Sequence, residues 1–399
     1  MTNLKHKHIL LGITGSIASY KSLYLASKLV QMEVNLSVIM TRTATKFISP
    51  LAFESIIHKK VITDIFTEQS DYPMQHIGLG SALDAVVIAP ATAQSISKIA
   101  NGLTNDALSL TILSTQAPLI IAPAMDGHML ENNITQENID KLKKSGALFI
   151  NNPTVGRLAS GLYGKGRLPE IELIIDELRF LFNKKGDLKE KNIVITAGGT
   201  RESIDPVRYI SNASSGKMGH ALAIAARDRG ANVILITAAK EDNTKKGIKT
   251  HTVITAEEMF NKVKKCINVK TDVLIMAAAV SDFKPQVTIK NKLKKLDKKE
   301  ISIKLESTRD ILKEINGDFI KIGFAAETNN IINEAQKKIT DKNLDLIIAN
   351  DITRKDSGFS SETNKVWMIN KNKETIELPT LTKFEVANKI LDQIKPLLD

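Results

Sequence analysis

Asp205, Arg208 and Asn212 stand in a long polar loop that joins an apolar run to a helical pattern in the second half of the chain. An arginine can hold a phosphate or carboxylate through two parallel hydrogen bonds, and an asparagine amide can hold a carbonyl or acyl-phosphate oxygen. Taken singly, Asp205 before a proline is equally well explained by a turn, and Asn212 by a helix cap. Their occurrence in one block with the segments TAGGTRE and SSGKMG favours a binding site for an anionic substrate.

Small residues end another apolar run in the same half, at residues 277–282. Ala278 and Ala279 would let a sugar or a base approach the backbone, and Asp282 could bond a ribose or a cytosine edge. Phe324 follows a later apolar run and could stack on a base. Ligands of parallel sheets bind at the carboxyl ends of the strands, where we expect these residues to gather.

Lysines in this half could meet phosphate charge. Lys292 begins the run KLKK, which follows the strand end that carries Asp282, and Lys338 and Lys342 are four residues apart on one helix face. A charged run is usually a solvated face, and the helical pair could equally be an exposed helix side. The place of the run after a strand end favours contact with a triphosphate.

The first half begins with a glycine turn at residues 12–16, GITGS, that is suited to a phosphate. Backbone N–H groups of the turn and of the following helix point at an anion, and the Ser16 hydroxyl adds a hydrogen bond. Many α/β proteins carry glycine there only for packing. Thr41, at the end of the next strand, could reach the same phosphate, and the small loop at residues 90–93 suits the approach of a flat ring.

His76 and a glycine-rich segment complete the candidates of the first half. His76 lies in a predicted loop, QHIGLG, where a histidine is usually a surface residue, but a pKa near neutrality makes it a plausible base. Residues 156–169, GRLASGLYGKGRLP, contain four glycines and two arginines and are too polar for a core element. They form either a surface loop or a flap that closes on a ligand.

The alternation of apolar runs with helical patterns predicts a doubly wound parallel sheet in each half. In the first half we expect strands at residues 8–13, 35–40, 84–89, 118–122 and 148–151, and helices at 16–31 and 169–182. In the second half we expect strands at 192–197, 232–237, 272–279, 321–325 and 344–349, a hairpin through 365–378, and helices from 215 and at 255–267, 329–342 and 381–397.

The length of 399 residues suggests more than one domain. Residues 183–191, NKKGDLKEK, are charged and contain a glycine, so we interpret them as a linker. The expected organisation is therefore an α/β domain at 1–182 and a second α/β domain at 192–399.

The composition, 43% hydrophobic and 25% charged, is typical of soluble globular proteins. No apolar run approaches the roughly 20 residues of a membrane span, and the start of the chain lacks the pattern of a signal peptide. The single cysteine, Cys266, excludes an internal disulfide and fits a reducing cytoplasm. The net charge of +11 could indicate nucleic-acid binding, but the lysines are scattered with few aromatics among them, so we favour lysines spread over solvated helix faces. An anionic small-molecule substrate is a third interpretation, and the motifs support it.

The motifs of the first half, taken in order, resemble those of a known family. They are GITGSIASYK, MTRTATKFI, QHIGLG, APATAQSISKIANG, APAMDGHM and ASGLYGKGRLPE. This half looks like the flavin-dependent decarboxylase part of the bacterial bifunctional phosphopantothenoylcysteine decarboxylase/phosphopantothenate–cysteine ligase, and the second half is similar to the ligase part. The resemblance covers almost the whole chain, and it implies a flavodoxin-like flavoprotein domain followed by a Rossmann-like ligase domain.

For the first half the resemblance implies an FMN-dependent decarboxylase with His76 as its base. The family chemistry is oxidation of the substrate's cysteine thiol by FMN, loss of CO2, and reduction of the resulting ene-thiolate by the reduced flavin. The resemblance places FMN on Gly15, Ser16, Thr41, Pro90, Ala91, Thr92, Ala124 and Met125.

Two residues of this half depart from the family pattern. Asp126 stands where the family has an asparagine that holds the substrate carboxylate, and two carboxylates repel unless one is protonated. Ser160 stands where the flap often carries a cysteine as proton donor, and a hydroxyl is a far poorer acid than a thiol. Tyr163 of the same flap is another candidate donor.

For the second half the resemblance implies a ligase that uses CTP, with Mg²⁺ accompanying the triphosphate. The carboxylate of 4′-phosphopantothenate attacks the α-phosphorus, pyrophosphate leaves, and the amine of cysteine displaces CMP from the acyl-cytidylate. Asn212 and Arg208 would serve the acyl intermediate. The residues implied for CTP are Ala278, Ala279, Asp282, Lys292, Arg309, Asp310, Ile311, Leu312, Phe324, Lys338 and Lys342, with Arg309 in place of the family's usual proline.

The resemblance also implies a cytoplasmic homo-oligomer, in which trimeric decarboxylase and dimeric ligase contacts build a dodecamer. It implies small-molecule substrates and neither a nucleic acid nor a membrane as partner. Three interpretations compete: a fused two-step enzyme of coenzyme A biosynthesis, a ligase whose decarboxylase half binds FMN but is impaired, and a basic α/β protein that binds nucleic acid. The first agrees with the motifs of both halves.

Overall fold

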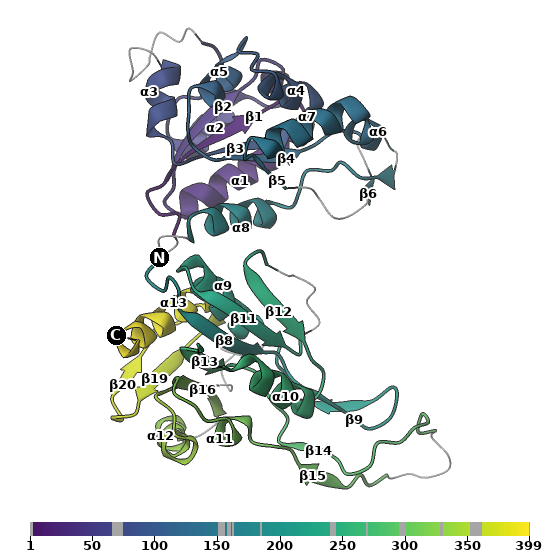
Figure 1. The fold of residues 1–399 in the computed structure, drawn as a ribbon, viewed down its shortest axis with the longest axis vertical. Helices are drawn as coiled ribbons and strands as arrows, with labels where there is room; N and C mark the ends of the chain where they lie inside the picture. Colours follow the sequence, from purple (N-terminus) through teal and green to yellow (C-terminus); the bar gives the residue numbers. More distant parts are fainter. Residues whose placement is uncertain are drawn as a thin grey trace. The chain divides into compact units, whose positions relative to one another are not determined.

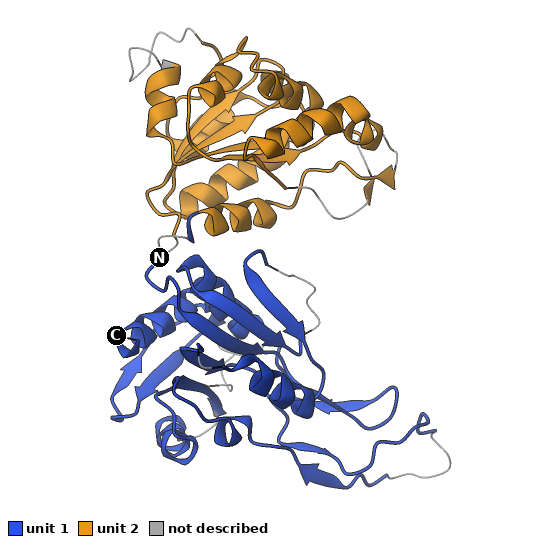
Figure 2. Ribbon diagram, in the orientation of Figure 1, with its two compact units in different colours: residues 1, 182–399 blue, residues 2–181 orange. Residues whose placement is uncertain are grey.

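The computed structural model describes residues 3–65, 75–150, 156–157, 161, 163–183, 186–239, 245–268, 270–294, 301–327, 330–351 and 361–398. The chain divides into two compact units, residues 2–181 and residues 182–399 (Figure 2). Each unit contains one main β-sheet with helices on both of its faces (Figure 1).

A parallel sheet organises the N-terminal unit (Figure 1). Within the described residues its strands are β1 (His8–Ile13), β2 (Asn35–Met40), β3 (Ala85–Ala91), β4 (Leu119–Pro123) and β5 (Leu148–Phe149). Their order is β2-β1-β3-β4-β5, and every neighbouring pair is parallel. This is the flavodoxin-like order, in which the direction of winding reverses between β1 and β3. The predicted fold class is confirmed for this unit.

Helices cover both faces of this sheet because its buried strands carry apolar side chains on both sides. Leu10, Ile88 and Ile121 share a core with helices on one face, and α1 contacts β1, β2 and β3 together with α2 and α8 on the other. The helices of the first face are α3 (Gln75–Ala82), α4 (Ala93–Ala100), α5 (Ala107–Leu113) and α7 (Asn133–Lys144), and α6 (Gly127–Glu131) packs on α7. The others are α1 (Ser19–Gln31), α2 (Pro50–Ile57) and α8 (Ile171–Leu181).

The segment that contains His76 is helical, and the prediction of a loop there was wrong. His76 is the second residue of α3, which packs on α5. The helix contains two glycines, and Gly80 lies so close to Ser114 that a Cβ would come within 2.7 Å of its Oγ. Tertiary packing thus overrides the low helix propensity of glycine.

The C-terminal unit is built on a longer sheet with the order β12-β11-β8-β13-β16-β17-β19-β20 in the described chain. These strands are β8 (Asn192–Ala197), β11 (Asn232–Thr237), β12 (Ile248–Thr252), β13 (Val273–Met276), β16 (Ile320–Glu327), β17 (Leu346–Asp351), β19 (Val366–Asn370) and β20 (Thr375–Glu377). The pairings from β12 to β17 are parallel and follow the Rossmann order, with the reversal between β8 and β13. The predicted Rossmann-like class and the hairpin of β19 with β20 are confirmed.

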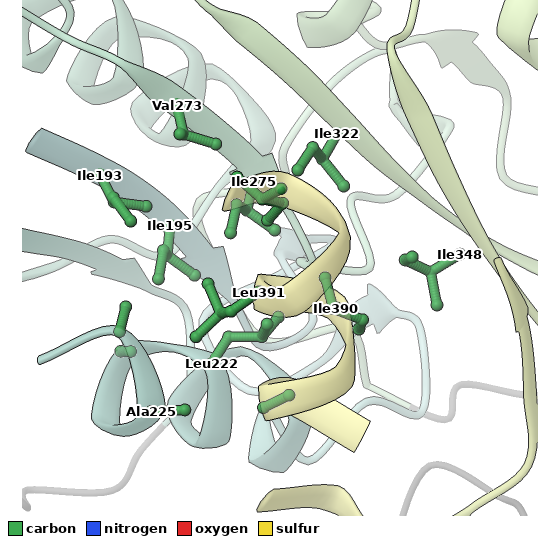
Figure 3. Close-up of a cluster of buried hydrophobic side chains, with 14 of the residues drawn as sticks. Ile193, Ile195, Leu222, Ala225, Val273, Ile275, Ile322, Ile348, Ile390 and Leu391 are labelled. Carbon is green, nitrogen blue, oxygen red and sulfur yellow. The ribbon is translucent and has the colours of Figure 1, made fainter. Parts of the chain in front are cut away.

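Helices α9 (Lys217–Asp228) and α13 (Lys383–Ile394) share one core with the sheet, while α10 (Ala256–Cys266), α11 (Ile311–Glu314) and α12 (Ile331–Lys342) share the core of the other face. Figure 3 shows Ile195 and Ile275 of the strands close to Leu222 of α9 and Leu391 of α13. These side chains are fully buried, so the hydrophobic effect holds both helices against the sheet.

Replacing Leu391 by alanine is expected to destabilise the C-terminal unit by about 3 kcal/mol, because a cavity replaces packed methyl groups. The chain has a single tryptophan, Trp367 of β19, so denaturant unfolding followed by its fluorescence reports on this unit. The matched control is Leu397→Ala, since Leu397 is exposed and should change the unfolding free energy little. Equal effects of the two variants would contradict the packing described for α13.

Short antiparallel pairs lie outside the two main sheets. The polar loop after β8, expected to lack regular structure, contains β9 (Arg201–Ser203) paired with β10 (Tyr209–Ser211). The other pairs are β14 (Phe283–Pro285) with β15 (Leu305–Ser307), β18 (Thr363–Asn364) with β21 (Leu381–Thr382), and β6 (Gly156–Arg157) with β7 (Tyr163–Gly164). The last pair belongs to the predicted flap.

Part of the predicted linker packs against the C-terminal unit. Leu188, which the interpretation of this segment overlooked, is 1% exposed and belongs to the core that α9 and α13 share. Asp187 forms an ion pair of 2.7 Å with Arg229, and the Leu188 N–H donates to the Arg229 carbonyl. Residues 187–188 are therefore anchored to the C-terminal unit rather than extended between domains.

Candidate active sites

A cavity of about 570 Å³ lies in the N-terminal unit at the carboxyl ends of β1, β2, β3 and β4. The reversal of winding between β1 and β3 leaves the loops after these strands apart, and this is where sheets of this order bind ligands. The expected FMN residues that line the cavity are Gly15, Ser16, Thr41, Thr92, Ala124 and Met125. Pro90 and Ala91 do not line it in the described structure, because they form the last residues of β3 rather than a loop.

The buried side chain of Thr14 joins two of these loops. Its hydroxyl donates to the Pro90 carbonyl at 2.8 Å and accepts from the Thr92 N–H at 3.0 Å. Thr92 in turn caps α4 by accepting from the Ser95 N–H. These hydrogen bonds hold the glycine turn after β1 against the start of α4.

Glycines allow close approach around the cavity. A Cβ on Gly15 would lie 2.4 Å from Cγ2 of Thr43, so a larger residue would displace the loop after β2. Gly166 has a positive φ of 107°, and a Cβ there would lie 2.2 Å from the Met125 carbonyl oxygen. The Met125 N–H also donates to the Gly166 carbonyl at 2.9 Å. The end of the predicted flap therefore lies directly against the loop after β4.

An ion pair on the cavity wall was missed by the sequence analysis. Asp106 accepts from Lys98 Nζ at 2.8 Å and from the Ser109 N–H at 2.8 Å, and it caps α5. Burial alone would raise the pKa of Asp106, but the hydrogen bonds from Lys98 and Ser109 lower it below its usual value. The sequence could have indicated the N-cap, because Asp106 precedes the apolar run ALSL. It gave no signal that Asp106 pairs with Lys98.

Among the described residues, the expected decarboxylase side chains lie outside the lining of this cavity. His76 is half-buried, and its carbonyl accepts from the Ser114 hydroxyl at 2.8 Å. Asp126 follows the lining residue Met125 and caps α6 by accepting from the His128 N–H at 3.0 Å. Ser160 lies outside the residues that the structure describes. Tyr163, the other candidate donor, is 78% exposed in β7.

A second cavity, of about 530 Å³, lies in the C-terminal unit at the carboxyl ends of β8, β13, β16 and β17. It is at the Rossmann switch point between β8 and β13. The expected ligase residues that line it are Asn212, Ala278, Ala279, Asp282, Arg309, Asp310, Ile311, Leu312, Phe324, Lys338 and Lys342. The fold thus gathers residues that are up to 130 positions apart in the sequence, as between Asn212 and Lys342.

Asn212, in the loop after β8, forms a hydrogen bond with the loop after β13. Its side-chain amide donates to the Val280 carbonyl at 3.0 Å, so the loop after β8 meets the loop after β13 inside the cavity. The Ser281 N–H donates to Thr200 Oγ1 at 2.9 Å and strengthens the same junction. The position of Asn212 in the site therefore depends on backbone groups that carry no signal in the sequence.

Helix α11 presents the Arg309–Leu312 stretch to the cavity. Asp310 caps this helix and forms an ion pair of 3.0 Å with Lys342. The Arg309 guanidinium lies 3.6 Å from Glu314 and 4.6 Å from the centre of the Phe260 ring. Beneath the helix, buried Lys321 donates to the Leu312 carbonyl at 3.0 Å, and burial lowers the pKa of this lysine.

Arg208 and Lys292 are not among the residues that line the second cavity. Asp205 is buried and accepts from the Val207 and Arg208 N–H groups, both at 2.7 Å, and from the Leu293 N–H at 3.2 Å. The Arg208 guanidinium donates to Asp205 at 2.9 Å and to the Leu293 carbonyl at 3.1 Å. In this chain Arg208 therefore braces the β9–β10 loop against the segment after β14, and Lys292 is exposed beside that junction.

Further lining residues of the second cavity lie outside the set expected for CTP and the acyl intermediate. They are Ser214, Ser215, Gly216, Lys217 and Gly219 around the start of α9, together with Thr308, Asn350, Asn364 and Lys383. The segment SSGKMG gave a signal, since it opens a helix after a strand, but Asn364 and Lys383 belong to stretches without any motif.

Neither cavity has the donor set of a protein-bound metal in the part of the chain that the structure describes. No three His, Cys, Asp or Glu side chains gather there as metal ligands. None of the described helices has both the length and the apolar character to cross a membrane.

Comparison with known proteins agrees with the order of the two units. A family described as DNA/pantothenate metabolism flavoprotein C-terminal domain matches residues 188–397, and a family described as Flavoprotein matches residues 1–183. The coenzyme A biosynthesis bifunctional protein CoaBC of Bacillus subtilis is 42% identical, over 99% of this chain and 98% of its own length. The chain belongs to this family of bifunctional proteins.

A second curated member matches over nearly the whole chain, and a solved C-terminal domain matches about half of it. The CoaBC protein of Borreliella burgdorferi is 43% identical, over 97% of this chain and 98% of its own length. The crystal structure of a CoaBC C-terminal domain is 42% identical, with a TM-score of 0.46, over 53% of this chain and 98% of that chain. As a member of the family, the chain is a bifunctional enzyme of coenzyme A biosynthesis, and its N-terminal unit is a flavoprotein domain.

Proposed function

We propose that the C-terminal unit joins 4′-phosphopantothenate to cysteine with CTP, and that the N-terminal unit decarboxylates the product, phosphopantothenoylcysteine, to 4′-phosphopantetheine with FMN. The observation that carries this proposal is the pair of cavities, each at the switch point of its own sheet and each lined by most of the residues expected for it. Family membership over 99% of the chain supports the pairing of the two activities.

In the ligase unit, the site acts mainly by position and charge. Asp282 and Phe324 hold the nucleoside, and Lys338 and Lys342 face the triphosphate across the cavity. The Asn212 amide holds the carbonyl oxygen while the carboxylate attacks the α-phosphorus and pyrophosphate departs. Cysteine then displaces CMP from the acyl-cytidylate. Mg²⁺ arrives with CTP as part of the substrate, because Mg²⁺ is commonly bound through substrate phosphates.

In the decarboxylase unit, the first cavity has the size and the glycine cradle for FMN. When bound, FMN supplies the oxidation of the substrate thiol and the later return of electrons. Gly15, Ser16 and Thr41 hold the phosphate, and Thr92, Ala124 and Met125 border the ring. His76 removes the proton from the substrate.

The second candidate function is that of a ligase whose N-terminal unit holds FMN but turns over slowly. Asp126 is the observation that favours it, since a carboxylate stands where the family binds the carboxylate of the substrate. Ser160, at the family's proton-donor position, also favours this second function, because a hydroxyl is a poorer acid than a thiol.

Product analysis decides between the two functions. The purified protein is incubated with 4′-phosphopantothenate, cysteine, CTP and Mg²⁺, and the products are separated by mass. Formation of 4′-phosphopantetheine with release of CO2 supports both activities. Accumulation of phosphopantothenoylcysteine on an FMN-loaded enzyme supports the ligase alone, and absence of both products overturns the proposal.

Asp126→Asn is expected to raise the rate of decarboxylation at low substrate concentration about tenfold. The substitution removes the negative charge, whereas asparagine caps a helix as well as aspartate and should keep α6 in place. Glu131→Gln is the control, since it removes a charge from the exposed end of the same helix. CO2 release is measured against substrate concentration, and an unchanged KM would show that residue 126 does not face the substrate carboxylate.

We further propose that the enzyme is a cytoplasmic homo-oligomer, with a dodecamer as the expected form. Exposed apolar side chains in and beside the short antiparallel pairs of the C-terminal unit, among them Val207, Phe283 and Val287, support self-association. Light scattering during size-exclusion chromatography measures the mass, and a monomer at micromolar concentration would refute this assignment.

A further inference from the structure

The Asp282 carboxylate is placed in the second cavity by its main chain. Asp282 is exposed and lines the cavity, where it is proposed to hold the nucleoside of CTP. Within the residues that the structure describes, its carboxylate forms no hydrogen bond or ion pair of its own. The position of this carboxylate therefore depends on the groups that fix the backbone at residues 281 and 282.

Thr200 holds this backbone from the loop after β8. It is fully buried, and its hydroxyl oxygen accepts from the Ser281 N–H at 2.9 Å. The Ser281 hydroxyl donates to the Thr200 carbonyl at 3.4 Å, and Ser281 itself is only 3% exposed. Loss of the Thr200 hydroxyl would leave a buried N–H without its acceptor, which costs more free energy than an ordinary hydrogen bond contributes.

Thr308 holds the same backbone from the segment before α11. Its hydroxyl donates to the Ser281 carbonyl at 2.5 Å, and its N–H donates to the Asp282 carbonyl at 2.9 Å. Thr308 lines the cavity and directly precedes Arg309, the first residue of the stretch that α11 presents to it. Residues 281 and 282 are therefore fixed by two threonines from segments that are far apart in the sequence.

Packing alone does not require a hydroxyl at residue 200. Valine has nearly the shape of threonine, and burial of a hydroxyl is unfavourable unless it forms a hydrogen bond. Within the described chain, the bond from the Ser281 N–H is the one hydrogen bond of this hydroxyl. Thr200 does not line the cavity, so this bond, rather than contact with a ligand, accounts for the hydroxyl.

We infer that Thr200 is a positioning residue of the ligase site, whose hydroxyl fixes residues 281 and 282 so that Asp282 binds the nucleoside of CTP. The inference rests on the proposed ligase function. Thr200 acts on the nucleoside and not on the phosphates, because Lys338 and Lys342, which are proposed to face the triphosphate, belong to α12. Loss of the hydroxyl should therefore weaken binding of cytidine nucleotides and leave binding of pyrophosphate unchanged.

Thr200→Val tests the inference in the full-length protein, because it removes the hydroxyl and nearly keeps the shape of the side chain. The Kd values of CMP and of a non-hydrolysable CTP analogue are expected to rise about tenfold, as for loss of a hydrogen bond to a buried group. The Kd of inorganic pyrophosphate and the KM of cysteine should not change. Thr200→Ser should recover most of the affinity, since serine retains the hydroxyl. Thr252→Val is the matched control, because Thr252 is exposed in β12 and does not line the cavity.

A double-mutant cycle with Asp282→Asn shows whether Thr200 acts through Asp282. If it does, the double variant binds CMP no more weakly than Asp282→Asn alone. Additive losses of CMP affinity would assign Thr200 a general structural role and overturn the inference. Equal loss of CMP and pyrophosphate binding, or wild-type affinity for CMP in Thr200→Val, would overturn it as well.

Thr308→Val provides the same test if Thr200→Val does not fold. It removes the hydrogen bond from the Thr308 hydroxyl to the Ser281 carbonyl, and its loss of CMP affinity should also disappear in the Asp282→Asn background. Additive losses in this second cycle would overturn the inference. If the wild-type protein binds no CTP, the proposed ligase function itself fails.

Discussion

Asn212→Asp is expected to lower the rate of ligation by at least about 100-fold, the usual cost of removing a donor that faces developing charge. The wild-type amide donates to the Val280 carbonyl and lies on the wall of the nucleotide cavity. A carboxylate at this position cannot donate to that carbonyl, and its negative charge repels both the acyl-phosphate and the triphosphate. The fold should persist, because the substitution changes no volume in a core.

The measurement is formation of phosphopantothenoylcysteine and of pyrophosphate in single-turnover conditions. If Asn212 holds the acyl intermediate, pyrophosphate release and product formation fall together or the acyl-cytidylate accumulates. Asn372→Asp introduces the same change in the exposed turn between β19 and β20 and should leave both rates unaltered. If the Asn212→Asp variant forms product at the wild-type rate, Asn212 does not act in the mechanism.

Ser16→Asp is expected to abolish retention of the flavin, with affinity for FMN lower by at least about 100-fold. Ser16 borders the first cavity in the turn after β1, where the phosphate of FMN is proposed to bind. Its Oγ accepts from the Ala18 N–H at 3.3 Å, and an aspartate could do the same, so the turn itself should survive. The new carboxylate would face the phosphate at short range, where repulsion of like charges amounts to several kcal/mol.

Flavin absorbance per protein chain after purification, and the Kd of added FMN by fluorescence quenching, measure this effect. The control is Ser55→Asp, because Ser55 is exposed on α2 and does not line the cavity. The ligase activity of Ser16→Asp should remain, since the second cavity belongs to the other unit. A flavin content equal to that of the wild type would show that the phosphate binds elsewhere.

The main strands were predictable because buried parallel strands appear in a sequence as short continuous apolar runs. Strands β1, β2, β8 and β11 have the predicted bounds, and α1 and α12 begin only a few residues from the expected positions. The short pairs in the polar loops were not predictable. The β9–β10 hairpin has no continuous apolar run like that of a buried strand, and Asp205 stabilises its turn by accepting hydrogen bonds from neighbouring N–H groups.

The candidate sites were predictable to the extent that they consist of loops at strand ends. Ser16, Thr92, Asn212 and Asp282 were expected on this ground, and they line the two cavities. Arg208 followed the same reasoning, yet its guanidinium is bound to buried Asp205 and to the Leu293 carbonyl. A motif indicates which residue types a loop contains, but the nearest oppositely charged group decides where a long side chain points.

The sequence alone establishes two α/β units in a stated order, the type of sheet in each, and the loops from which each site is built. It does so because apolar periodicity and glycine turns are local properties of the chain. Only the tertiary structure brings Lys98 to Asp106 and Thr200 to Ser281, and only it turns Arg208 away from the nucleotide cavity. These contacts depend on charge and burial between segments far apart in the chain, which become neighbours when helices pack on the sheets.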